Sequence, residues 1–187
     1  MGVAVQSHWF SVGSLVTWGK AGVGVVATQS FINPSFGPRG LSLLENGLTP
    51  ELAVKTLLEL DEGRKVRQLA ILDVHGNVEA YTGENCIVEA GHFIGNNFSV
   101  QANLMDKNTV WPAMAEAFKK TKGSLAERML AAMEAAQSEG GDIRGKQSAV
   151  LLVYNTKAVK YEWMDKKIDL RVDDHTAPLI ELERLLN

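Results

Sequence analysis

GVAVQSHWF at residues 2–10, GVGVVATQS at residues 22–30 and FINPSFGPRG at residues 31–40 decide the fold of this chain. The first two stretches combine small and β-branched residues, which favour β-strands, and each ends in polar side chains. The third is rich in Pro and Gly, which marks a turn. We therefore expect strands over residues 2–7 and 23–28, with a site at their polar ends.

The rest of the chain alternates blocks of strands with pairs of helices. Period-two patterns bounded by turn residues predict strands, and apolar residues at helical spacing predict helices. Thr49-Pro50 is a helix start, and Ser124 with Glu127 is a capping box. The segment 9–18 is expected to be a connection. The pattern predicts strands over residues 69–74, 78–82, 89–94, 98–105, 147–154, 159–164 and 168–172. It predicts two helices that start at Leu41 and at Pro50, and three more that cover residues 108–120, 124–138 and 179–186.

The order of these elements predicts the fold class. Helices come in pairs between blocks of antiparallel strands, which argues against the strict strand–helix alternation of a doubly wound parallel sheet. Several strands are apolar throughout, as is typical of strands that are covered on both faces. We expect a single α+β domain over residues 1–187, built as a four-layer αββα sandwich of two antiparallel sheets flanked by helix pairs.

Composition narrows the class of partner. The 187 residues carry a net charge of −3, which gives no electrostatic case for nucleic acid or an anionic membrane surface. No apolar run approaches the roughly 20 residues of a membrane span, and the first ten residues lack the features of a signal peptide. The single cysteine, Cys86, excludes an intramolecular disulfide and fits a reducing cytoplasm. We expect a cytoplasmic protein that contacts neither nucleic acid nor membrane.

Signature motifs of nucleotide, metal and serine-hydrolase sites are absent. There is no GxGxxG after a strand, no Walker loop, no GxSxG, no HExxH and no CxxC. The four histidines share no ligand spacing, so no cofactor and no metal is predicted. Asp173-Asp174-His175 is left open: it is either a metal-binding group or an acidic lead into the last helix, where the helix dipole favours carboxylates.

Five blocks of sequence resemble a known family. They lie at residues 2–10, 27–40, 98–105, 145–148 and 170–175, and in this order they resemble domain-of-unknown-function family 1028, which is grouped with the Ntn (N-terminal nucleophile) hydrolases. The resemblance covers nearly the whole chain. It implies the αββα sandwich that the element order predicts independently, and it implies no particular substrate.

The resemblance to the wider Ntn superfamily implies positions for catalytic residues. The opening strand is similar to the one that follows the nucleophile strand in proteasome-type subunits, which places Ser7 or His8 near the nucleophile. Asp142 and Ser148 lie in a stretch that is similar to the motif supporting the active-site amine. Residues 97–103 are similar to a loop that brings a further polar group to the site.

The start of the chain departs from this pattern. An Ntn hydrolase uses a Thr, Ser or Cys at the mature N-terminus, whose own α-amine activates the hydroxyl or thiol. This chain begins with Met1-Gly2, and neither side chain can act as that nucleophile. Members of the family usually begin one short strand earlier, and that strand carries a Thr. The resemblance therefore implies a domain that lacks its usual first strand, with residues 2–7 as the second.

The first functional hypothesis is an amide-bond hydrolase of Ntn type that acts on a small amide or peptide-like substrate. Side-chain amides and hydroxyls at strand ends would position the substrate and stabilise the oxyanion. Arg39 is either a carboxylate-binding residue or part of an ion pair at the start of a helix. The residues expected to bind substrate are Thr28, Gln29, Arg39, Asn97, Gln101, Asn103 and Gln147.

The second hypothesis is a non-catalytic binding or assembly module on the same fold. Trp9, Phe10 and Trp18 form an aromatic cluster that is either an oligomer interface or part of the core. A missing first strand would also leave a sheet edge that must be covered. Under either hypothesis we expect a homo-oligomer.

Overall fold

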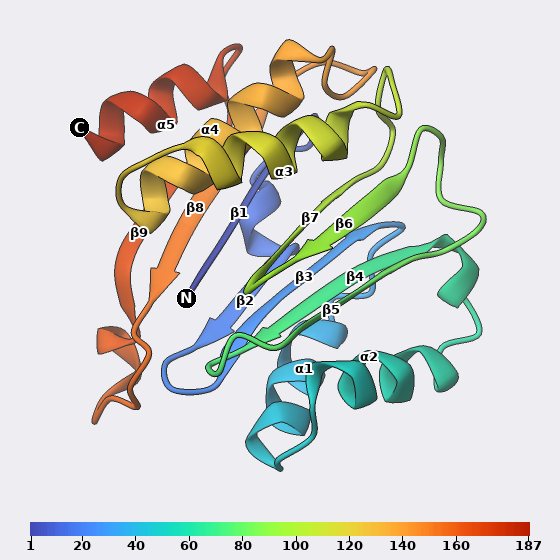
Figure 1. Cartoon of the computed structure of the whole chain (residues 1–187), viewed down its shortest axis with the longest axis vertical. Coiled ribbons are helices and arrows are strands. Elements are labelled where there is room, and N and C mark those ends of the chain that lie inside the picture. Colours follow the sequence, from blue (N-terminus) through green and yellow to red (C-terminus); the bar gives the residue numbers. More distant parts are fainter.

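The computed structural model describes residues 1–187 and contains nine strands and five α-helices (Figure 1). The strands are β1 (Gly2–Ser7), β2 (Thr17–Lys20), β3 (Gly24–Ser30), β4 (Arg67–Asp73), β5 (Val78–Thr82), β6 (Gly91–Gly95), β7 (Phe98–Ala102), β8 (Ser148–Tyr154) and β9 (Lys166–Val172). The helices are α1 (Phe36–Glu45), α2 (Pro50–Glu59), α3 (Val110–Lys120), α4 (Leu125–Ser138) and α5 (Pro178–Leu186).

All strand pairs are antiparallel, as the turn signals predict. One sheet has the order β1-β8-β9, a second has the order β2-β3-β4-β5, and β6 and β7 form a hairpin. Helices α1 and α2 lie on one side of the strands, and α3, α4 and α5 lie on the opposite side (Figure 1). The chain therefore has a mixed α/β fold with several antiparallel sheets and five helices.

Three buried clusters hold these elements together. The first joins α1 and α2 to β3 and β4, with Phe36 and Leu57 fully buried. The second joins α3, α4 and α5 to β7 and β8, with Leu151 fully buried. The third lies between β3 and the β1–β8 pair and contains Val25 and Val150. The two larger sheets therefore face each other, because the third cluster is made of side chains from both.

Capping residues set the helix starts where the sequence predicts them. The Thr49 hydroxyl accepts a hydrogen bond from the Leu52 N–H at 3.3 Å, and Pro50 occupies the first turn. Ser124 and Glu127 form the predicted capping box, with hydrogen bonds of 3.3 Å and 2.6 Å. None of the helices combines the length and the apolar character that crossing a membrane requires.

Three predictions about elements are wrong, and several strand ends differ by a few residues; the strand predicted over residues 98–105, for example, ends at Ala102. Helix α1 begins at Phe36 rather than Leu41, because Pro38 lies in the first turn, where backbone N–H groups need no helical partner. Residues 17–20 form β2, which pairs with β3 but is too short to show a periodic pattern. Residues 159–164 are not a strand: they belong to the connection that reverses the chain between β8 and β9 and include a 3-10 turn.

Among the strands at sheet edges, β1 and β7 line a common groove. β1 pairs only with β8, and β7 pairs only with β6. Residues 1–4 and residues 97–101 line the same apolar groove of about 160 Å³, which α4 covers through Met129 and Met133. We call this space the edge groove. Unpaired strand edges expose backbone N–H and C=O groups that can pair with another strand.

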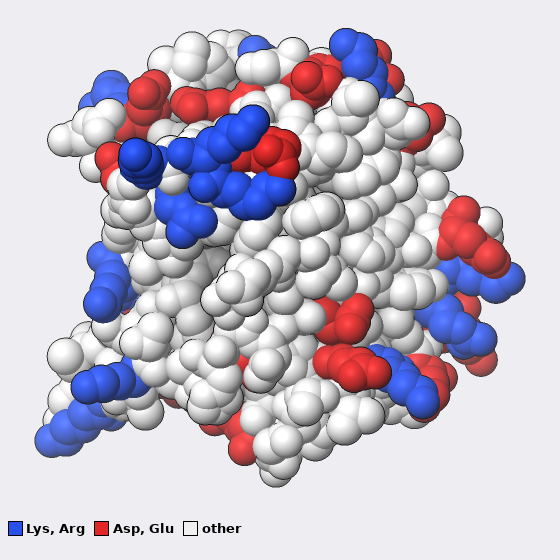
Figure 2. Space-filling view, viewed as in Figure 1, with Lys and Arg blue, Asp and Glu red and all other residues white.

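Charge is unevenly spread over the face seen in Figure 1. Figure 2 shows Lys and Arg side chains gathered near the α3–α4 turn, with a broad uncharged area beside them. Lys119 and Lys120 lie in the last turn of α3, and both lie within ion-pair distance of Glu116. Their charge is therefore partly neutralised, unlike the basic stripe that is typical of nucleic-acid binding proteins.

Candidate functional site

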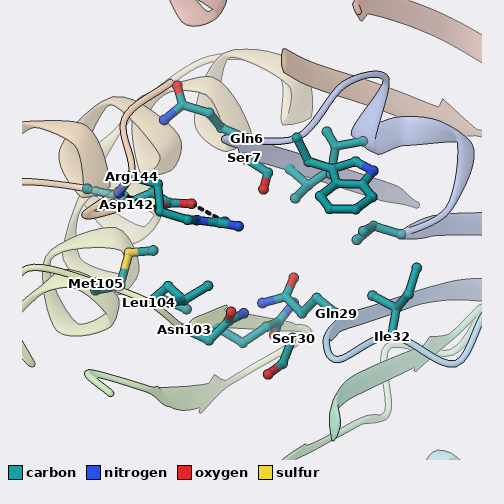
Figure 3. Close-up of a pocket in the computed structure, with 18 of the residues that line it drawn as sticks. Gln6, Ser7, Gln29, Ser30, Ile32, Asn103, Leu104, Met105, Asp142 and Arg144 are labelled. Atoms are coloured by element: carbon teal, nitrogen blue, oxygen red, sulfur yellow. Dashed lines mark hydrogen bonds and ion pairs between the residues drawn. The ribbon is translucent and has the colours of Figure 1, made fainter. Parts of the chain in front are cut away.

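A pocket of about 570 Å³ lies where β1, β3 and β7 end (Figure 3). Its volume is in the range of small-molecule sites, which are mostly apolar with a few convergent polar groups. Polar residues that line it are Gln6, Ser7, Gln29, Ser30, Gln101, Asn103, Asp142 and Arg144. Its apolar lining includes Trp9, Val12, Leu15, Val16, Phe31, Ile32, Ile87, Leu104, Met105 and Met133.

Side-chain amides form one wall of the pocket. Gln29 donates from Nε2 to Gln68 Oε1 at 2.6 Å, and Asn103 donates from Nδ2 to the same oxygen at 3.0 Å. Each amide therefore keeps its carbonyl oxygen and a second N–H for a ligand. Figure 3 shows Gln29, Ser30 and Asn103 on one side of the pocket, with Ser7 on the opposite side.

The fully buried Gln68 holds this wall in place. Its Nε2 has two N–H donors and lies within hydrogen-bond distance of Thr82 Oγ1, at 2.9 Å, and of the carbonyl oxygens of Gly91 and Ala102, at 3.1 Å and 2.9 Å. Thr82 in turn lies 2.8 Å from His92 Nδ1, and burial lowers the pKa of His92. The Nδ1 atom of a neutral His92 can accept a hydrogen bond from the Thr82 hydroxyl. A continuous series of hydrogen bonds through Thr82 and Gln68 therefore orients both pocket amides.

An ion pair forms another wall. Arg144 donates to the Asp142 carboxylate from Nε at 2.9 Å and from Nη2 at 2.6 Å (Figure 3). The Asp142 side chain is 7% exposed and also accepts a hydrogen bond from the backbone N–H of Arg144 at 2.9 Å. The hydrogen bond with Asp142 raises the pKa of Arg144, so the guanidinium stays charged. Arg144 is the only Lys or Arg that lines the pocket.

Ser7 presents a hydroxyl to the pocket without a base beside it. Its carbonyl oxygen accepts from the Gln147 N–H at 3.1 Å, but its hydroxyl has no hydrogen-bond partner. The α-amine of Met1 donates to the Tyr154 carbonyl oxygen at the other end of β1. At a rise of roughly 3.3 Å per residue, this amine is about 20 Å from Ser7 and cannot activate it.

Two residues in the pocket wall have unfavourable backbone conformations. Ser30 has a φ angle of 65° and Leu104 has a φ angle of 60°, both in the left-handed region. Such conformations cost about 1–3 kcal/mol at residues other than glycine and cluster at functional sites. The strain therefore supports a functional role for this pocket.

The structure brings together only part of the predicted site. Ser7, Gln29, Gln101, Asn103 and Asp142 line the pocket. The predicted residues that lie outside its lining are His8, Thr28, Arg39, Asn97, Gln147 and Ser148.

Most of the residues outside the pocket have local roles. Thr28 is fully buried in β3, and Gln147 donates from Nε2 to Asp174 at 3.2 Å. Asn97 occupies the β6–β7 turn with a φ angle of 62°. Arg39 is exposed on α1 and forms no ion pair, so the structure shows neither of its two predicted roles.

Ser148 is fully buried and joins two segments. Its hydroxyl donates to the Trp9 carbonyl oxygen at 2.5 Å and accepts from the Val12 N–H at 3.1 Å. Both hydrogen bonds fasten the connection after β1 to the start of β8. The hydroxyl proton is therefore engaged with the Trp9 carbonyl oxygen, and Ser148 does not line the pocket.

The predicted site residues do not include Gln6, Ser30, Gln68 or Arg144. Gln6 donates to Gln137 at 2.9 Å, and its carbonyl oxygen is buried without a partner. Gln68 is the second residue of β4, next to Arg67 and just before an apolar run, so its sequence position does not distinguish it from an ordinary polar strand start. Arg144 follows Asp142 by two residues, a spacing that allows an ion pair but is not specific to a site.

The segment 173–175 forms local hydrogen bonds. Asp173 accepts from the Ser11 hydroxyl at 2.8 Å, and Nδ1 of His175 accepts from the Ala177 N–H at 3.0 Å. No group of three or more His, Cys, Asp or Glu side chains is arranged to hold a metal ion. These contacts favour a structural role at the approach to α5.

The chain belongs to a family of unknown function, DUF1028, whose sequence pattern matches residues 1–182. A crystal structure of the protein SPO2555 from Silicibacter pomeroyi, assigned to the same family, is similar, with a TM-score of 0.88 and 32% sequence identity. The match covers 99% of this chain and 78% of that chain. A comparison with curated proteins finds no significant match.

Proposed function

We propose that the protein is an amide-bond hydrolase of the Ntn type, with its active site in the pocket between Ser7 and the Gln29–Asn103 wall. The observation that carries this proposal is the edge groove, which leads into that pocket. We also assign the two facing sheets and their outer helices to the αββα sandwich of this superfamily. The single buried Cys86 supports action in a reducing cytoplasm.

The groove and the pocket lie along the same two strands. Residues 1–4 of the N-terminal strand segment and residues 97–101 line the groove, whereas residues 4–7 and 101–105 line the pocket. β1 and β7 therefore run side by side from the groove toward the pocket. A strand that precedes Met1 and joins it through a tight turn would run antiparallel to both, and its first residue would reach the pocket.

Such a strand would place a nucleophile and its base beside Ser7. The hydroxyl or thiol of its first residue would attack the substrate carbonyl carbon, and its own α-amine would accept the displaced proton. The proton would pass to the leaving amine as the C–N bond breaks, and water would hydrolyse the resulting ester or thioester. The free N–H groups of Gln29 and Asn103 are suitable donors to the oxyanion.

Turnover by an extended chain tests this proposal. The 187-residue protein and a form extended upstream by a Thr-led strand would be compared for release of amine from a panel of small N-acyl amides. We expect hydrolysis by the extended form alone, and loss of hydrolysis when its leading Thr is replaced by Ala. Turnover that survives this replacement, or a substrate panel left untouched by the extended form, would contradict the proposal.

The alternative function is a non-catalytic binding module. The observation that favours it is the Ser7 hydroxyl, which has no base within hydrogen-bond distance. Amine release by the extended form separates the two functions, because a binding module releases no amine from any member of the panel. Equal labelling of the wild type and the Ser7→Ala variant by an acyl-directed probe would show that Ser7 is not the nucleophile that reacts with the probe.

Exposed apolar side chains near the pocket support a homo-oligomer. Trp9 is 56% exposed and Phe10 is 62% exposed, whereas Trp18 packs against the α1–α2 cluster and belongs to the core. Exposed aromatic residues are enriched at protein interfaces. We expect Phe10→Ser to shift the sedimenting species toward the 20.4 kDa monomer.

Ile180→Ser is the matched control, because Ile180 is 69% exposed on α5 and does not line the pocket. It should leave the sedimentation profile unchanged. A wild-type protein that already sediments as a 20.4 kDa species at high concentration would contradict the oligomer.

A further inference from the structure

We propose that the pocket selects amides that carry a free carboxylate, with Arg144 as the carboxylate-binding residue and an apolar acyl group at the opposite end. This inference names the substrate class of the proposed hydrolase. Only the statement that the bound amide is hydrolysed rests on that proposed function. The binding claim stands on the pocket itself.

Arg144 keeps the part of its guanidinium that suits a carboxylate. A guanidinium has five N–H donors in a fixed plane. Asp142 takes the Nε donor and one donor of Nη2, which leaves one N–H on Nη2 and both on Nη1. One N–H from each terminal nitrogen forms the fork that binds a carboxylate through two parallel hydrogen bonds. The Arg144 side chain is 38% exposed and lines the pocket, so the fork is accessible.

The charge of the pocket favours a monoanion. Arg144 and Asp142 are the only charged residues among those that line it, and they neutralise each other. A bound carboxylate would complete an alternating arrangement of negative, positive and negative groups. A phosphate dianion would bring two negative charges to a single cation that already has a partner, so a carboxylate fits better.

The positions of the polar groups set the orientation in which a ligand would bind. Figure 3 shows Arg144 and Asn103 toward one side of the pocket and Ile32 on the opposite side, with Ser7 and Gln29 between them. Trp9, Val12, Leu15 and Val16 add to the apolar lining. An N-acyl amino acid matches this order: its carboxylate would meet Arg144, its amide would meet the pocket amides and its acyl group would lie on the apolar side.

Calorimetric titration of the 187-residue protein with N-benzoylglycine and with N-methylbenzamide tests this inference. The two probes share a benzoyl amide, but only the first carries a carboxylate. Arg144→Gln should weaken N-benzoylglycine binding roughly 10- to 100-fold, as expected for a hydrogen bond to a charged group, and should leave N-methylbenzamide binding unchanged. Arg144→Lys, which keeps the charge without the fork, should weaken it by less.

Arg171→Gln is the matched control. Arg171 forms a similar ion pair with Asp169, at 2.6 Å, on β9 and does not line the pocket. This variant should bind both probes as the wild type does. Equal N-benzoylglycine affinity in the wild type and Arg144→Gln, or no binding to the wild type, would overturn the inference. Selective binding without hydrolysis of any amide by the extended chain would leave the inference intact and remove the proposed function.

Discussion

Replacing Gln68 by leucine is expected to destabilise the protein by roughly 3 kcal/mol or more, although the two side chains are similar in size. Gln68 is fully buried, and its amide group satisfies the carbonyl oxygens of Gly91 and Ala102 as well as two pocket amides. Leucine can satisfy none of these groups. Urea unfolding of the variant measures the loss.

The same replacement should also disorder the pocket wall. Without Gln68, neither Gln29 nor Asn103 keeps its anchoring hydrogen bond, so affinity for amide ligands should fall together with stability. Gln147→Leu is the control, because Gln147 has one exposed side-chain hydrogen bond, to Asp174. Gln147→Leu should lower the free energy of unfolding by less than about 1 kcal/mol. A Gln68→Leu protein as stable as this control would refute the role given to Gln68.

Ser148→Ala is expected to cost about 2–3 kcal/mol in unfolding free energy while leaving the activity of each folded molecule unchanged. The variant would leave the Trp9 carbonyl oxygen and the Val12 N–H without their partner, and Val12 is 3% exposed. Thermal unfolding and turnover per active site would be measured on the same sample of the extended chain.

The control for this change is Ser138→Ala. Ser138 is exposed at the end of α4 and bonds only to the Glu134 carbonyl oxygen one turn before it, so its replacement should be nearly neutral. A Ser148→Ala protein that keeps full stability but loses turnover would give Ser148 a catalytic role instead of the structural one argued above.

Much of the fold follows from local signals in the sequence. The caps at Thr49 and Ser124 set two helix starts, and the turn at residues 75–77 joins β4 to β5. These signals act over a few residues, so a single sequence displays them. Strand β2 was missed because its pairing with β3 depends on tertiary contacts that four residues do not reveal.

The site was less predictable because it is assembled from distant segments. Arg39 and Arg144 are the same residue type, and each follows a Gly- or Asp-containing turn region in the sequence. Only the packing of β1, β3 and β7 places Arg144 at the pocket and leaves Arg39 on an exposed helix face. Ser148 shows the converse: its position in the sequence suggested a catalytic role, but burial and two backbone hydrogen bonds give it a structural one.

The opening strand has one edge without a strand partner. The sequence raised the question of a partner for residues 2–7, and β1 indeed has β8 on one side and the edge groove on the other. A strand in this groove would lie between β1 and β7 and would convert their separate pairs into one continuous sheet. That geometry connects the proposed nucleophile to the pocket.

Peptide mapping after labelling with an acyl-directed probe tests this connection most directly. The chain extended by a Thr-led strand would be treated with a β-lactone, which acylates an activated hydroxyl, and digested for mass spectrometry. We predict a single adduct on the leading Thr, formed more slowly when N-benzoylglycine occupies the pocket. An adduct on Ser7, or an unlabelled Thr in a folded protein, would contradict a nucleophile delivered through the edge groove.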